Sequence, residues 1–144
     1  MAKERIHARP RWGKFRVPRY DTTYVVTDPD VSGMGGLDIA RVKLFFSFRH
    51  HDKTYPCALV HWFSKIGQGP DVNTGMWRVE PDFDAEGEAL YAVIHIDTII
   101  RAAHLIGEPN GPLSRSITYV SALDMFDTFY VNKYLDHHAY EIAF

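Results

Sequence analysis

The sequence predicts an α+β fold in which a small antiparallel β-barrel, SH3-like and partly open, is followed by C-terminal helices. Three observations lead to this prediction. Strand-like segments recur at close spacing with turn-forming residues between them, the last third of the chain changes to a helical period, and 144 residues suit one hydrophobic core. We expect a basic N-terminal arm over residues 1–22 and a single domain over residues 23–144.

The first predicted strand covers residues 22–27, where Thr, Tyr and Val dominate before a turn-forming Asp-Pro-Asp sequence. A glycine-rich loop follows at residues 32–36. Residues 39–64 then predict a long hairpin, because strand-like segments lie on both sides of a polar turn at residues 50–53.

Three shorter strands are expected at residues 76–81, 89–96 and 101–106. An acidic turn at residues 82–88 separates the first two, and a single turn at residues 97–100 separates the second from the third. A series of short strands like this is typical of an antiparallel barrel and argues against alternating β-α units.

The C-terminal third of the chain has helical spacing. Ser121 and Asp124 form a variant of the capping box in which Asp replaces the usual Glu. Apolar residues behind them recur every three or four positions, which predicts an amphipathic helix over about 122–134 packed on the barrel. Asp136 is expected to cap a second short helical turn, so the helical segment spans about 121–142. The apolar positions are Leu123, Phe126, Tyr130 and Tyr134.

Positive charge is concentrated at the N-terminus. Residues 1–19 carry seven basic residues and one acidic residue, a net +6, whereas the rest of the chain carries −8. A basic arm on an acidic body favours phosphate contacts with DNA that depend on salt and not on base sequence. The alternative is a solvated arm that packs on the acidic face of its own domain. The predicted DNA-contacting residues are Lys3, Arg5, Arg9, Arg11, Lys14, Arg16 and Arg19.

The chain has a single cysteine, Cys57, and so cannot form an internal disulfide. We expect this thiol to be a small buried group in a protein kept in a reducing compartment, either nuclear or cytoplasmic. The N-terminal residues lack the pattern of a secretory signal, and no uninterrupted apolar run is long enough to cross a bilayer. No membrane partner is therefore expected.

Aromatic residues on or near the predicted strands are candidates for a ligand groove. An aromatic cage can hold a methylated lysine, since a quaternary cation is attracted to ring faces. Such a cage would make the chain a reader of histone tails or of another partner protein. The alternative is that Trp62 and Trp77 fill the core. The candidate groove residues are Tyr55, Trp62, Trp77 and Tyr91.

A metal site at the C-terminus is a third interpretation. His137 and Glu141 are four residues apart and would share one helical face, with His138 beside them. A metal-dependent hydrolase or nuclease would need a further ligand from a strand histidine, and the sequence lacks the His-Glu-x-x-His pattern. We therefore predict no catalytic residue, no cofactor and no enzymatic activity. The strand histidines are His61, His95 and His104.

Four segments carry a resemblance to a known family. They are ARVKLFFSF, YPCALVHWFSKIGQGPDVNTGMWRVEP, VIHIDTIIRAAHLIG and FYVNKYLDHHAYEIAF. Together they resemble, over about residues 36–144, the C-terminal region of proteins encoded by fungal transposons of the Kyakuja-Dileera-Zisupton group, including the Plavaka-type elements. The resemblance implies a part in DNA transposition. It implies no catalytic residue here, because the catalytic core of such proteins lies upstream, on an RNase-H-like domain with acidic metal ligands.

The order of these segments is also similar to the layout of the bromo-adjacent homology domain, a chromatin-associated barrel. This similarity implies contact with chromatin or with another protein. Together with the basic arm, it leads us to expect a non-catalytic accessory domain of a transposon-derived protein, contacting DNA, chromatin or a transposase core. A reader of histone tails or partner proteins and a metal-dependent hydrolase or nuclease are the alternatives.

Overall fold

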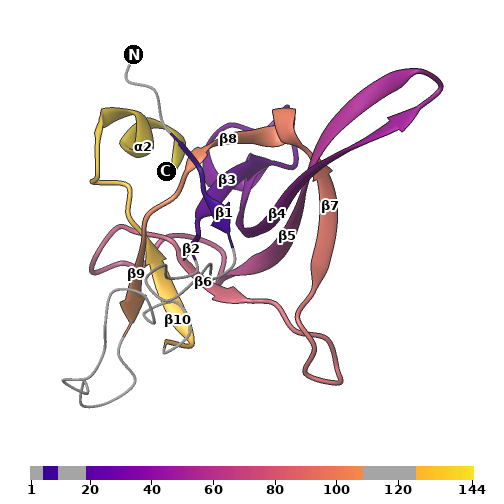
Figure 1. Cartoon of the computed structure of the whole chain (residues 1–144). Helices are drawn as coiled ribbons and strands as arrows, with labels where there is room; N and C mark the ends of the chain where they lie inside the picture. The colour runs from indigo at the N-terminus through magenta and orange to yellow at the C-terminus, as the bar shows by residue number, and fades with distance from the viewer. Residues whose placement is uncertain (1–4, 10–18, 109–125) are drawn as a thin grey trace.

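In the computed structural model of the chain, the described residues are 5–9, 19–108 and 126–144. Their main sheet has eight antiparallel strands in the order β8-β3-β4-β5-β6-β10-β9, with β7 also paired to β5, and it curls into a half-barrel (Figure 1). A small β-barrel-like fold is therefore confirmed. The strands are β3 (Thr22–Val26), β4 (Leu37–His50), β5 (Lys53–Ile66), β6 (Arg78–Pro81), β7 (Tyr91–His95), β8 (Ile99–Ala102), β9 (Leu105–Glu108) and β10 (Thr128–Val131); the 3-10 segments are η1 (Gly33–Gly36) and η2 (Ile96–Thr98).

Two residues join the two ends of this sheet. β8 lies at one end of the strand order and β9 at the other, yet only Ala103 and His104 separate them in sequence. Three peptide units span at most about 11 Å, so the sheet has to curl to bring its ends together. The strand predicted at 101–106 is thus two strands. Thr22 stabilises the connection between β8 and β9, because its Oγ1 donates to the Ala103 carbonyl oxygen at 2.7 Å.

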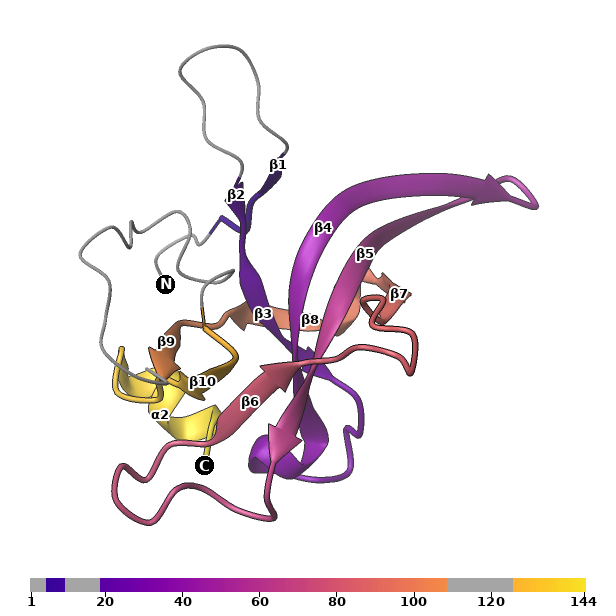
Figure 2. The same cartoon turned by 90° about the horizontal axis from the view of Figure 1, so that it is seen from below.

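The predicted long hairpin is confirmed. β4 and β5 are 14 residues each, and their outer halves extend away from the body of the half-barrel (Figure 1, Figure 2). The turn between them consists of His51 and Asp52, which both have positive φ, 49° and 61°. Two such residues are typical of the hairpin turn whose twist matches that of the flanking strands.

Close to the body, β4 and β5 are buried on both faces, because successive residues of a strand project to opposite sides. Ile39 and Phe63 face a first core that also contains Tyr24 and Phe129. A second core lies on the other side of the same strands and contains Val25, Ala40, Val42, Ala58 and Val60. Burial on both faces accounts for the nearly continuous apolar sequence of these strands.

The helix predicted over 122–134 is wrong where the structure describes it. Residues Thr128–Val131 form β10, which pairs with β6 and β9. Phe129 and Val131 are each 1% exposed and alternate with partly exposed residues, so the strand period of two prevailed over the helical spacing. Ser121, Leu123 and Asp124 lie outside the described residues.

The only α-helix of the described residues is α2 (His137–Ile142). Its predicted cap is confirmed, since Asp136 Oδ1 accepts the Ala139 N–H at 2.8 Å. The helical segment expected over about 121–142 is thus reduced to this one element in the part of the chain that the structure describes. No described helix is long and apolar enough to cross a membrane.

The start of the chain adds a two-stranded ribbon. β1 (Ala8–Arg9) and β2 (Arg19–Tyr20) pair in antiparallel fashion. The Asp21 N–H closes the ribbon by donating to the His7 carbonyl oxygen at 2.8 Å, and the Val42 N–H donates to the Asp21 carbonyl oxygen at 2.9 Å. The second of these bonds ties the base of the ribbon to β4.

Candidate nucleic-acid interface

The ribbon brings Tyr20 onto β4, where two cations lie over its ring. Arg41 Cζ is 5.5 Å from the ring centroid and Lys43 Nζ is 4.3 Å from it. Both distances are within the range over which an aromatic face attracts a cation. Arg41 Nε also donates to the Tyr20 carbonyl oxygen at 3.3 Å. This Tyr20 cluster, made of Tyr20, Arg41 and Lys43, joins the end of the basic arm to the body of the protein.

The local geometry of β4 explains how the two cations meet. Arg41 and Lys43 are two residues apart on one strand, a spacing that directs side chains to the same side. The register with β5 shifts between Val42 and Leu44, so Lys43 is the extra residue of a β-bulge. Bulges bend a strand and re-aim side chains, and here both cationic groups end over the same ring.

Three of the seven predicted DNA-contacting residues belong to the described part of the chain. Arg5 is exposed. Arg9 and Arg19 occupy paired positions of the ribbon, and Arg19 directly precedes Tyr20. The backbone pairing therefore brings two positions of the basic arm to the edge of the Tyr20 cluster. The others, Lys3, Arg11, Lys14 and Arg16, lie outside the described residues.

Arg41 and Lys43 were not among the predicted interface residues. Their alternation with Val42 fits the solvent side of any strand and does not by itself indicate a site. A weaker signal exists in the charge of the hairpin, because residues 41–66 contain five Lys or Arg residues and one acidic residue, Asp52, in an otherwise acidic body. The hairpin is thus a second basic segment of the chain.

Arg78 and Glu108, two groups with displaced pKa values, lie outside this cluster and link strands to one another. The Arg78 guanidinium donates to Glu108 Oε2 at 2.7 Å, and this hydrogen bond is the main reason that the pKa of Glu108 lies below its ordinary value. Thr128 Oγ1 donates to the same oxygen at 2.8 Å and lowers the pKa further. These contacts connect β6, β9 and β10, which indicates a structural role.

The predicted groove residues Tyr55 and Tyr91 lie in different surroundings. Tyr55 stacks on Phe48 in the outer half of the hairpin, with ring centroids 5.2 Å apart and an angle of 21° between the planes. Tyr91 is 53% exposed, and its ring lies 5.5 Å from that of His61. Each tyrosine therefore has its own ring neighbour.

The two predicted groove tryptophans pack against the two different cores. Trp62 packs against the second core, whereas Trp77 packs against the first. Lys65 Nζ lies 5.8 Å from the Trp77 ring, and the buried Trp77 Nε1 has no hydrogen-bond partner among the described residues. No ring contact joins Tyr55, Trp62, Trp77 and Tyr91 to one another in the ranges that the structure describes.

The candidate metal ligands make contacts of other kinds. His137 Nε2 lies 2.9 Å from Glu141 Oε1, and the two side chains are 87% and 57% exposed. His138 Nδ1 lies 3.3 Å from Arg101 Nη1. The strand histidines have separate partners, which are the Asp82 carbonyl oxygen for His61, the Asp97 N–H for His95 and the Asn132 side chain for His104. Within the described ranges, no group of three or more His, Cys, Asp or Glu residues could hold a metal ion.

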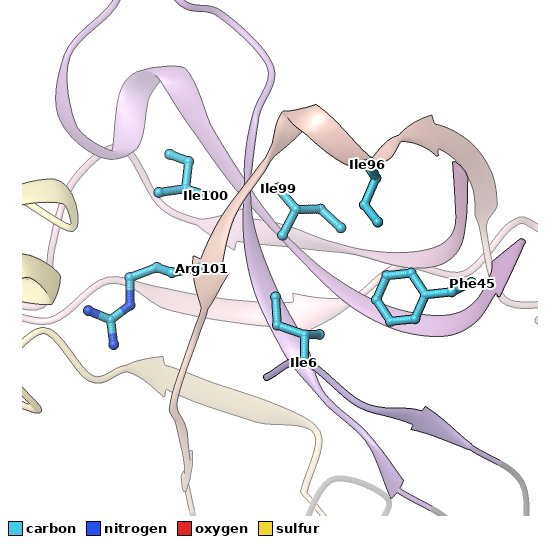
Figure 3. A pocket seen from close by; sticks show the side chains of 6 residues that line it. All are labelled: Ile6, Phe45, Ile96, Ile99, Ile100 and Arg101. Carbon is cyan, nitrogen blue, oxygen red and sulfur yellow. The ribbon is translucent and has the colours of Figure 1, made fainter. Parts of the chain in front are cut away.

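An apolar hollow of about 410 Å³ lies between the hairpin and the η2–β8 segment. Figure 3 shows Ile6, Phe45, Ile96 and Ile99 around this space, with Ile100 and Arg101 at its margin. The Arg101 guanidinium is directed elsewhere, since it forms an ion pair with Asp136 at 2.8 Å. The lining of the hollow offers shape and apolar contact but no polar group suited to catalysis.

The chain matches no protein-family model, no curated protein and no solved structure. The resemblances drawn from its sequence segments therefore remain predictions.

Proposed function

We propose that this chain is a non-catalytic DNA-contacting module whose basic arm and hairpin act as one surface. The observation that carries the proposal is the Tyr20 cluster, in which Arg41 and Lys43 lie over the ring of a residue that ends the arm. The cluster anchors the arm on β4 and adds two cations to the seven of the arm. DNA phosphates are the ligand that such a surface fits best.

The charge distribution restricts where DNA can approach. The chain outside residues 1–19 carries a net −8 and repels a polyanion over most of its surface. The arm and the hairpin of β4 and β5 are the exception. Phosphate contacts made there release bound counterions, so the affinity falls as salt rises, by about 0.9 in the logarithmic slope for each phosphate neutralised.

The test is the salt dependence of binding to a short DNA duplex, measured by fluorescence anisotropy. Lys43→Gln is expected to flatten the logarithmic salt slope by about 0.9. Lys133→Gln is the matched control. It also removes a positive charge that lies over an aromatic ring, since Lys133 Nζ is 5.4 Å from the Tyr134 centroid, but this charge is near α2 and away from the Tyr20 cluster. The control should leave the slope unchanged.

Two results would contradict the proposal. One is an equal effect of the two substitutions, which would mean that DNA senses only net charge. The other is the absence of any DNA binding by the intact chain at low salt.

The setting of this activity is also proposed. The four segments that resemble Kyakuja-Dileera-Zisupton proteins support a transposon-derived module that acts beside a transposase core or on chromatin, in the nucleus. The order of the same segments supports assignment of the half-barrel to the bromo-adjacent-homology or SH3-like class. Coexpression with a transposase core of this group, followed by co-purification, tests the partner.

A further inference from the structure

The outer half of the hairpin carries an exposed aromatic pair. Phe48 on β4 and Tyr55 on β5 are cross-strand partners, so their rings lie on the same side of the hairpin. The rings are close to parallel, at 21°, and Phe48 is 47% exposed. We refer to these two residues as the Phe48 platform.

An apolar strip continues from the platform toward the body. Phe46 is on the same side of β4 as Phe48 because it is two residues away. The bulge at Lys43 brings Leu44 to this side as well, opposite Leu59, and Leu44 remains 49% exposed. Without the bulge, Leu44 would lie on the same side as Val42, which faces the second core. An exposed contiguous apolar strip of this kind marks a binding surface.

A lysine lies beside the platform. Lys53 Nζ lies 5.5 Å from the centroid of the Tyr55 ring, and Lys53 pairs with His50 across the hairpin. Arg49 is exposed as well, but it directly follows Phe48 and therefore projects from the opposite side of the hairpin. Aromatic faces with cations beside them are the combination that binds bases and phosphates of an unpaired strand together.

We propose that the Phe48 platform binds single-stranded DNA, with a base stacked on the aromatic pair and a flanking phosphate held by Lys53. This inference rests on the proposed DNA contact and specifies the form of DNA. In a duplex the base faces are covered by neighbouring bases, so only an unpaired strand offers a face to Phe48 and Tyr55. Stacking tolerates any base, so the site is expected to bind without base preference.

Charge favours this occupant over a second copy of the chain. Residues 41–66 carry five cationic residues and a single acidic one. Two such hairpins packed face to face would bring like charges together over most of their length, which costs affinity. A polyanion relieves the same repulsion.

An acidic turn limits the site at the end nearest the body. Asp84 Oδ1 accepts the N–H groups of Glu86 and Glu88, both at 2.9 Å, so four acidic residues are held close to one another in residues 82–88. Tyr91 lies beside this turn and is 53% exposed, compared with 47% for Phe48. We therefore expect the strand to follow the outer hairpin and to avoid Tyr91.

The experiment measures the affinity for a labelled oligothymidylate at several salt concentrations. Phe48→Ala is expected to weaken binding about tenfold with no change in the salt slope, because a stacking contact is lost and every cation is kept. Phe48→Trp should retain the affinity, and Tyr91→Ala should leave it unchanged. Since Phe48 is half exposed at the end of a hairpin, unaltered thermal melting is expected for all three variants.

Each other outcome overturns the inference. If Lys43→Gln flattens the salt slope while Phe48→Ala has no effect on affinity, the proposed phosphate contacts are supported and the proposed stacking site is wrong. Equal losses from Phe48→Ala and Tyr91→Ala would indicate a general apolar surface. If sedimentation shows a wild-type dimer that Phe48→Ala dissociates without affecting the oligonucleotide, the platform is an interface between copies. Failure of the intact chain to bind any DNA removes both proposals.

Discussion

Arg101 on β8 and Asp136 at the start of α2 form an ion pair through two contacts, Nη1 to Oδ1 at 2.8 Å and Nη2 to Oδ2 at 2.9 Å. The same carboxylate accepts the Ala139 N–H and so caps the helix. The hydrogen bond from Arg101 is the main cause that lowers the pKa of Asp136 to about 2. A single side chain thus caps the C-terminal helix and links it to β8.

This ion pair predicts a specific acid sensitivity. The pKa of Asp136 is 3.8 ordinarily and about 2 in the folded protein, so its contribution to stability is complete above pH 4 or so and is lost as the pH falls toward 2. Asp136→Asn keeps a capping side chain but removes the charge. Its free energy of unfolding, measured with urea, should vary less than that of the wild type over this pH range.

Parallel pH profiles for the two proteins would contradict this account. They would show that the Arg101 contact contributes equally in both protonation states.

Substitution of the buried Tyr24 by Phe is expected not to destabilise the protein. Its side chain is fully buried, and its hydroxyl group has no hydrogen-bond partner among the described residues. Burial raises the pKa of Tyr24 to about 12. Tyr24→Phe removes an unsatisfied polar group, so the free energy of unfolding should stay equal or rise by up to about 1 kcal/mol.

Thr22→Val provides the contrast for Tyr24→Phe. Thr22 Oγ1 donates to the Ala103 carbonyl oxygen at 2.7 Å in a buried site, and its loss should lower the free energy of unfolding by about 1 kcal/mol. A loss of that size in Tyr24→Phe would instead mean that the hydroxyl group is satisfied. Chemical denaturation of both variants distinguishes the two cases.

Gly107 tests whether the segment after residue 126 packs as a strand. Gly107 lies opposite Phe129 on β9, and a Cβ atom at this position would collide with the ring of Phe126. Gly107→Ala is therefore expected to lower the free energy of unfolding by about 1–3 kcal/mol in urea denaturation. Gly69→Ala is the matched control, since no atom of the described residues other than its own chain neighbours lies within 4 Å of its Cβ position. An equally small effect of both substitutions would argue against the β9–β10 packing.

Much of the sheet follows from local sequence. β3 and the hairpin of β4 and β5 were predictable, because β-branched residues and alternation coincide there with clear turn signals. β10 was not predictable from spacing alone. Phe126, Tyr130 and Tyr134 fit a helical face, whereas Phe129 and Val131 fit a strand, and the pairing with β6 and β9 decides between the two.

The candidate site is likewise predictable from the sequence only in part. The basic arm is visible in the composition, since seven cationic residues lie within the first 19. The Tyr20 cluster depends on the base of the ribbon lying on β4, about twenty residues away in sequence, and no local pattern encodes that contact. Sequence reasoning therefore found the arm but not its anchor.

The most direct test of the DNA contact is a nuclear magnetic resonance titration of the ¹⁵N-labelled chain with a short DNA duplex at low salt. The account predicts that the largest shift changes among the described residues occur at the backbone amides of Tyr20, Arg41 and Lys43, and that they fade as salt is raised. Changes confined to residues 133–144, or no changes at all, would contradict it.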